Sequence, residues 1–133
     1  MSNITVTNND LGNVILKDAQ FRDAPITFAG AGTLLEGTIL AVDSASLKFV
    51  PFVKGGVTNE NGIPKGILTY EVTATGAGDV QSRVGVAGSY RKERLVIDAD
   101  GDASNLDQFN IDQLRDYGLV PIDVQELNIL DNQ

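Results

Sequence analysis

Apolar residues come in short stretches from Asn13 onward, and this spacing is what most limits the folds open to the chain. The stretches read VILK, ITF, GTILAV, LKFVPF, GILTYEV and VGVAG, and clusters of Gly, Asp, Ser and Asn separate them. Short runs between turn residues are typical of strands. Because aromatic residues make up only 6% of the 133 residues, Val, Ile, Leu and Ala must fill the core. We therefore expect a small, single-domain, mainly β fold.

The segment 37–52, GTILAVDSASLKFVPF, predicts a hairpin with its turn at 43–46. Pro51 has no backbone N–H to give to a central strand, so the second strand is expected at a sheet edge. Phe49 and Phe52 point to opposite faces of an extended strand, so one is expected in the core and the other nearer an interface or loop. Two interpretations of Pro51 and Phe52 stay open: a blocked edge packed beneath the next loop, or an edge that faces another subunit.

A second hairpin is predicted around the turn at 75–79, between the stretches ILTYEV and VQSRVGVAG. Before it, the connection 53–66 contains four glycines, a proline and two asparagines, which is typical of a mobile surface loop. In VQSRVGVAG the apolar residues alternate with polar ones, placing Val80, Val84 and Val86 on one face and Gln81 and Arg83 on the other. One face of this strand should meet a core, and the other should meet water or a neighbour.

One short helix is predicted near the C-terminus, within the segment SNLDQFNIDQLRDYGL. Asn110 followed by Gln113 resembles a capping box, and Ser104 offers an alternative, earlier start. Gly118 is placed to end the helix in a left-handed conformation. The apolar alternation after the helix predicts a further strand, which Pro121 restricts to a sheet edge or to its first residues.

The formal net charge is −8, and the surplus lies at the C-terminal end, where residues 93–133 hold ten acidic residues against Arg94 and Arg115. A chain this acidic repels phosphate backbones, so we expect no nucleic-acid partner. The absence of Cys excludes disulfides and thiolate metal sites. No apolar segment is long enough for a signal peptide or a membrane span, so we expect no membrane partner and a chain kept in aqueous solution.

The segment DADGDAS places Asp98, Asp100 and Asp102 with the alternation of the first three ligands in a calcium loop. An EF-hand loop also needs Gly at its sixth position and a bidentate acid at its twelfth, where this chain has Ala103 and Phe109. We therefore interpret the three carboxylates as solvated groups before a helix and expect no metal site.

The chain has no His and no Cys, so only carboxylates, Lys and Tyr remain as catalytic bases or nucleophiles beside the hydroxyl residues. Its glycine pairs do not extend into a phosphate-binding motif, so no cofactor is expected. Composition alone leaves a two-carboxylate glycosidase open. Such a site needs several aromatic side chains to hold sugar, and the chain has five Phe, three Tyr and no Trp. We therefore expect a protein that is not an enzyme.

Five segments, taken in order, resemble the bacteriophage lambda-type head decoration proteins. The first is GTILAVDSASLKFVPF, which is similar to the family's Gly-Thr-Ile/Val-Leu strand, turn and Lys-Phe/Tyr-Val-Pro-Phe/Tyr strand. The others are Gly66-Ile67-Leu68 with Val72-Thr73-Ala74, the Val-rich strand that ends in Val84-Gly85-Val86-Ala87-Gly88, Arg94-Leu95-Val96-Ile97, and Leu114-Arg115-Asp116-Tyr117-Gly118-Leu119. Their order and spacing match across about residues 30–120, whereas residues 1–29 match no family motif.

The resemblance implies a β-tulip or barrel-like domain with one short helix and no catalytic activity. It also implies a homotrimer that binds the major capsid protein at three-fold and quasi-three-fold sites of the expanded head and stabilises it. Such a protein is made in the host cytoplasm and then lies on the outer surface of the virion capsid. Pro51 and Phe52 would then be expected at the subunit interface.

Residues 1–12 are interpreted as a flexible N-terminal arm, followed by a single β-rich domain over 13–133 with a tail from about 121. The arm is polar, and its apolar positions are few. Alternation gives it strand propensity but too little apolar surface to order alone, as expected of a segment that joins a partner's open sheet edge. The residues expected to bind the capsid are Ile4, Thr5, Val6 and Leu11.

An alternative from another class is a small trimeric β-sandwich binding module of a phage fibre, which would bind a glycan or a receptor. It would share the strand pattern and the trimeric assembly. Aromatic residues clustered on one face would favour it, and the sequence shows no such cluster.

Overall fold

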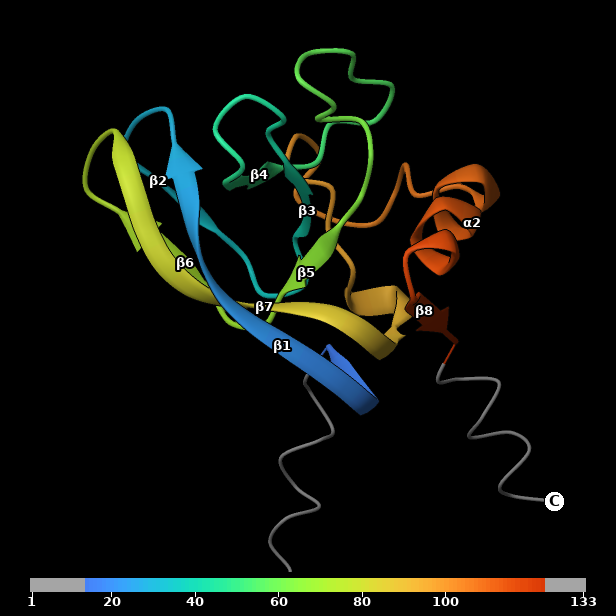
Figure 1. The fold of residues 1–133 in the computed structure, drawn as a ribbon. Helices are drawn as coiled ribbons and strands as arrows, with labels where there is room; N and C mark the ends of the chain where they lie inside the picture. Colours follow the sequence, from blue (N-terminus) through green and yellow to red (C-terminus); the bar gives the residue numbers. More distant parts are fainter. Residues whose placement is uncertain (1–13, 124–133) are drawn as a thin grey trace, which may run out of the picture.

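The computed structural model describes residues 14–123 and is mainly β, with one α-helix near the C-terminus, as the sequence predicts. Two strands are long and the others are short (Figure 1). The elements are β1 (Ile15–Phe28), β2 (Gly32–Leu34), β3 (Ile39–Val42), β4 (Phe49–Pro51), β5 (Gly66–Leu68), β6 (Val72–Ala74), β7 (Gly78–Arg91), the 3₁₀ turn η1 (Lys92–Arg94), α2 (Gln108–Asp116) and β8 (Leu119–Ile122).

The main sheet has the strand order β1-β4-β3-β5-β7-β8, and an additional pairing joins β1 to β7. The pairings of the first five strands therefore form a closed circuit. The two long strands β1 and β7 run antiparallel and side by side, from Ile15 opposite Tyr90 to Phe28 opposite Gly78 (Figure 1). β2 and β6 form a separate two-stranded sheet.

The hairpin predicted over 37–52 is confirmed, because β3 and β4 pair antiparallel with Ala41 opposite Val50. The second hairpin is confirmed only in part. β5 pairs antiparallel with β7, with Ile67 opposite Gly85, but Val72–Ala74 turns away and pairs with β2. β7 instead takes β1 as its main partner.

Both phenylalanines of the first hairpin are buried, with 1% of each exposed, so the expectation that one lies nearer an interface or loop is wrong. Phe49 belongs to a core cluster with Ile26, Leu40 and Leu68. Phe52 belongs to a second cluster, whose members include Val14, Ile39, Ile67, Tyr90, Leu95, Leu114 and Leu119. Both faces of this short strand are therefore packed against core residues.

The strand that contains Pro51 has neighbours on both sides, β3 along its length and β1 at a single position, Phe49 opposite Ile26. Pro51 pairs with Leu40 of β3 and lies beyond that one contact with β1. The strand is thus an edge only at its proline end, which is where a missing N–H is tolerated.

The N-cap of α2 lies three residues before the predicted capping position, Asn110. Asp107 is the N-cap, and its carboxylate accepts a hydrogen bond of 3.0 Å from the Asn110 backbone N–H. The Gln113 side chain bonds to the Asn110 side chain, not back to its backbone, so the capping box predicted at Asn110 is wrong. Gly118 has φ +82° and ends the helix as expected.

β8 follows the helix and pairs parallel with the end of β7 as the outermost strand of the sheet, which confirms the edge position predicted from Pro121. No helix within residues 14–123 is long and apolar enough to cross a membrane.

Candidate interaction surfaces

The predicted site residues fall into two groups. Ile4, Thr5, Val6 and Leu11 of the expected arm lie outside the described residues. Phe52 is buried inside the chain and has almost no surface to offer a second subunit, whereas Pro51 is partly exposed. The interface expected at this strand end stays a prediction and depends on Pro51.

Large exposed apolar side chains lie in three regions of the described chain. The first includes Phe21 of β1, with Leu35 and Tyr70 in loops. The second comprises the turn between β3 and β4 and the 53–65 loop, which the backbone bond from Ser44 N–H to Asn59 oxygen joins at 3.0 Å. It carries Leu47, Val53 and Val57. The third is the exposed side of α2, with Phe109 and Tyr117.

Val14, where the described chain begins, is fixed to the body through both of its backbone groups. Its N–H donates to Glu36 Oε2 at 3.1 Å, and its carbonyl oxygen accepts from the Arg91 N–H at 2.7 Å. Arg91 is also opposite Ile122 of β8, one residue before the described chain ends. Both ends of the described chain therefore lie beside the end of β7, at the lower side of Figure 1.

A groove of about 420 Å³ lies on one side of Val14. The Arg83 guanidinium lies over the Phe21 ring, 5.4 Å from its centroid, and Arg83 Nε is 3.7 Å from Asp23 Oδ1. The Thr69 hydroxyl donates to the backbone oxygen of Arg83 at 2.8 Å. The groove is lined by Ile15, Phe21, Asp23, Thr69, Tyr70 and Arg83.

A second groove, of about 370 Å³, is lined by Glu36, to which the Val14 N–H is bonded, and is acidic. Leu35 supplies an exposed apolar side chain, and Glu36, which holds the Val14 N–H, lies next to it in the sequence. The charged residues that line it are four acids and one base: Glu36, Glu71, Glu93, Asp102 and Arg94. Tyr70 lines the first groove, and its neighbour in the sequence, Glu71, lines the second.

We call the area around Val14 the exit surface, formed by Ile15, Phe21, Leu35, Glu36, Tyr70 and Glu71. Sequence reasoning did not select any of its apolar residues. The available signal was weak: Phe21 is a single aromatic residue between Gln20 and Arg22. Only the pairing of β1 with β7 brings it near Arg83.

A cleft of about 520 Å³ lies beside Pro51 in the second region. Its wall includes the segment Ala29–Gly32, where an added Cβ at Gly30 or Gly32 would meet nothing within 4 Å. Two carboxyls line it. The backbone N–H groups of Ala45 and Ser46 lower the pKa of Asp43, whereas burial raises the pKa of Asp98.

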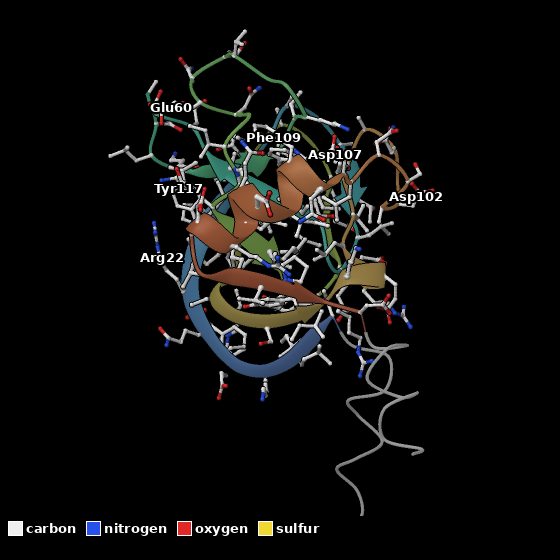
Figure 2. All side chains as sticks on the ribbon, turned by 90° about the vertical axis from the view of Figure 1, so that its right-hand side faces the viewer. Arg22, Glu60, Asp102, Asp107, Phe109 and Tyr117 are labelled. Carbon is white, nitrogen blue, oxygen red and sulfur yellow. The ribbon has the colours of Figure 1, made fainter. Side chains whose placement is uncertain are left out.

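The helix α2 forms the third region and faces the viewer in Figure 2, with Phe109 in its first turn and Tyr117 just after its end. Lys65 Nζ lies 4.4 Å from the centroid of the Tyr117 ring. At the other end of the helix, Lys54 Nζ is 3.0 Å from Asp107 Oδ2 and 2.7 Å from the Asn105 oxygen. These contacts attach the 53–65 loop to the helix.

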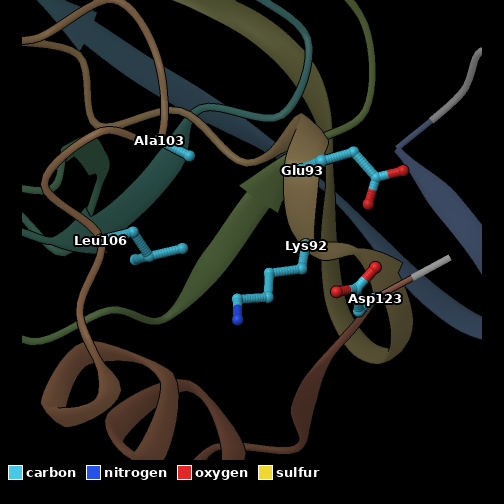
Figure 3. A pocket seen from close by; sticks show the side chains of 5 residues that line it. All are labelled: Lys92, Glu93, Ala103, Leu106 and Asp123. Carbon is cyan, nitrogen blue, oxygen red and sulfur yellow. The ribbon is translucent and has the colours of Figure 1, made fainter. Parts of the chain in front are cut away.

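A smaller cavity of about 190 Å³ lies beside the end of β8 (Figure 3). Ala103 and Leu106 line one side of it, and Lys92, Glu93 and Asp123 line the other. It is close in size to a single side chain.

The aspartates of DADGDAS form a turn and not a cluster of ligands. The Ser104 hydroxyl and N–H lower the pKa of Asp102, and the Ile97 N–H donates to the Asp102 oxygen at 3.0 Å to close the turn. Over residues 14–123, no group of three or more His, Cys, Asp or Glu is placed to hold a metal ion.

Comparison with known families gives one match. A family model described as "Bacteriophage lambda head decoration protein D" matches residues 4–119. No curated protein matches the chain significantly.

Proposed function

Because the chain belongs to the bacteriophage lambda head decoration protein D family, a structural family of the phage head, we propose that it binds the expanded head as a homotrimer and stabilises it. Family membership itself supports the role in capsid decoration and the location in the virion. The finer proposal is that the trimer lies at three-fold and quasi-three-fold sites on the outer surface, in contact with the major capsid protein. No catalytic step is part of this function.

Residues 1–12, and in particular Ile4, Thr5, Val6 and Leu11, are proposed to anchor the protein by pairing with an open strand edge of the shell. The observation that carries this proposal is the fixed position of Val14. Because the arm is joined to the domain at a fixed point, binding of the arm to the shell would hold the whole domain there. Ordering each residue costs about 1 to 2 kcal/mol of backbone entropy. One arm therefore binds weakly, and three arms on one trimer gain through effective concentration.

The trimer contact is proposed to involve the cleft beside Pro51. Support comes from the size of this cleft, about 520 Å³, and from the exposed Leu47, Val53 and Val57 near it. A closed ring needs two different, complementary patches on each subunit, and an apolar cleft with exposed side chains beside it can provide one of them. Pro51 ends the ladder there, so the contact would be made by side chains.

Deletion of residues 1–12 tests the anchor. The truncated protein should remain a folded trimer with a near-normal melting temperature and should no longer decorate purified expanded heads in a sedimentation assay. Saturation of heads at the same concentration as the full chain would show that the anchor lies elsewhere.

Light scattering of the full chain tests the oligomeric state separately. A mass three times that of one chain is expected at micromolar concentration. A monomer at that concentration would contradict the proposed trimer, whatever the arm does.

A further inference from the structure

We propose that the exit surface docks directly onto the capsid protein and forms a second contact beside the arm. This inference rests on the proposed function, since it takes the head as the partner. It adds that the body binds through Phe21, Leu35 and Tyr70, and that the shell surface opposite them carries apolar side chains bordered by Lys or Arg.

Position is the first support. The Val14 N–H is bonded to Glu36, which lines one groove, and the next residue, Ile15, lines the other. The start of the described chain therefore lies near both grooves. A partner that binds residues immediately before Val14 must come within a few residues' length of both grooves, because each extended residue spans at most about 3.6 Å.

Apolar exposure is the second support. Phe21, Leu35 and Tyr70 are 42%, 43% and 49% exposed, and each lines one of the two grooves. The Arg83 guanidinium lies over the Phe21 ring, 5.4 Å from its centroid, so a cation borders this apolar side chain. Grouped apolar exposure of this kind, with polar groups around it, is typical of interaction sites.

Charge indicates the chemistry of the partner. Four carboxylates against one arginine line the second groove, and the whole chain carries a net charge of −8. An acidic partner would be repelled, whereas Lys or Arg on the shell would be attracted and would also speed association. The first groove carries the balanced pair Asp23 and Arg83, so the acidic character lies on the Leu35 side.

The other two regions lack the first of these supports. Phe109 lies on α2, and Leu47 and Val57 lie on loops at the top of Figure 1, whereas the described chain begins at the lower side. Because the second region is proposed for the trimer contact, the exposed side of α2 provides the matched control of similar chemistry.

The experiment measures binding to purified expanded heads by sedimentation. The variants are Tyr70→Ser and Phe21→Ser, and the control is Phe109→Ser, which removes an exposed aromatic side chain from α2. We expect each exit-surface variant to weaken head binding by about tenfold or more, as central apolar contacts do. The control should bind as the wild type does.

A charge variant provides a second, independent readout. Glu71→Lys combined with Glu93→Lys reverses two exposed acids of the second groove, and Asp116→Lys is the control on α2. The reversal should weaken head binding and reduce its dependence on salt, and Asp116→Lys should do neither. Unchanged or tighter binding by the reversed variant would overturn the charge assignment.

The outcomes separate the inference from the proposed function. If the wild type does not bind heads, the proposed function fails. If the wild type binds and the Tyr70 and Phe21 variants bind equally well, only the docking surface is wrong. If those variants lose the trimer in light scattering while Phe109→Ser keeps it, the exit surface is a contact between subunits, and the inference is overturned. Thermal melts of each variant exclude unfolding as the cause.

Discussion

The Tyr90 phenol packs over Gly85 of the same strand, and its oxygen fills the space that a Cβ at Gly85 would need. The hydroxyl donates to the Ala87 oxygen at 2.9 Å. Gly85→Ala should therefore destabilise the fold by about 1 to 3 kcal/mol through overpacking. Adding Tyr90→Phe should recover part of that loss, because it removes the overlapping oxygen. Denaturant unfolding of both single variants and the double variant checks this, and strictly additive losses would contradict the overlap.

Alkaline pH should weaken the fold through the same tyrosine. Burial raises the pKa of Tyr90 from 10.0 to about 12, so the folded state favours the neutral phenol. The resulting stability is complete below pH 10 and is lost as the pH rises toward 12. Tyr90→Phe should show a smaller loss of melting temperature over this range. Equal losses in the two proteins would show that other groups control alkaline unfolding.

Gly37 should tolerate no side chain. It has φ +92°, and an added Cβ would overlap the backbone oxygen of Arg94. Gly37→Ala should cost about 2 to 4 kcal/mol, because backbone strain and the clash with a rigid carbonyl act together. Gly30→Ala is the matched control, since a Cβ there meets nothing within 4 Å. Unfolding in denaturant should show a large loss for the first variant and almost none for the second.

Acid should destabilise the protein below about pH 4. Four aspartates at the surface, of which Asp43 is partly buried, accept hydrogen bonds in their charged form, which lowers the pKa of each. The largest causes are the Ala45 N–H for Asp43, Lys48 for Asp79, the Ser104 side chain for Asp102 and the Asn110 N–H for Asp107. The stability that these groups provide is present above the ordinary value of 3.8 and is lost as the pH falls through the lowered values. Burial raises the pKa of Asp98, which acts in the opposite direction.

Melting temperatures measured from neutral pH to about pH 3 test this expectation. Asp79 accepts from Thr27 through Oδ1 and from Lys48 through Oδ2, so Asp79→Asn keeps only one of these acceptors and loses the charge. Its acid sensitivity should therefore be reduced. A profile that is flat down to pH 3 in the wild type would contradict the role of these carboxylates.

Calcium should leave the melting temperature unchanged. Asp102 is already engaged by the Ser104 N–H at 2.9 Å, and Ala103 and Phe109 stand where a calcium loop needs Gly and an acid. Melts with excess calcium and with chelator should superimpose. A rise of several degrees with calcium would show that the DADGDAS turn binds the ion.

Local patterns in the sequence predicted the local elements. The β3–β4 hairpin follows from two apolar runs around a polar turn, and the helix end follows from a glycine at Gly118. The N-cap was misassigned because Asp107 and Asn110 are both good capping residues at a suitable spacing, and only the structure shows which side chain accepts the bond.

The sequence did not predict which strands pair when they lie far apart in the chain. Nothing in the segment from Lys17 to Asp23 indicates that its partner lies at 83–89. The stretch ILTYEV was predicted as one strand of a hairpin, whereas its two ends belong to β5 and β6, which pair with different strands. The exit surface is a product of that same pairing. Its residues come from β1, the loop after β2 and the connection between β5 and β6, so no single stretch of sequence contains it.

The pairing of β1 with β7 also determines how early during synthesis the domain can fold. Ile15 meets Tyr90 and Phe28 meets Gly78, so the first long strand is synthesised about 60 residues ahead of its partner. At about 5 to 20 residues per second, a ribosome leaves β1 waiting for roughly 3 to 12 seconds. The chain must be made as far as Arg91 before the circuit of strands can close, and contacts between such distant residues form slowly. Val14 is therefore fixed only after β7 has been made, because its carbonyl oxygen accepts from the Arg91 N–H.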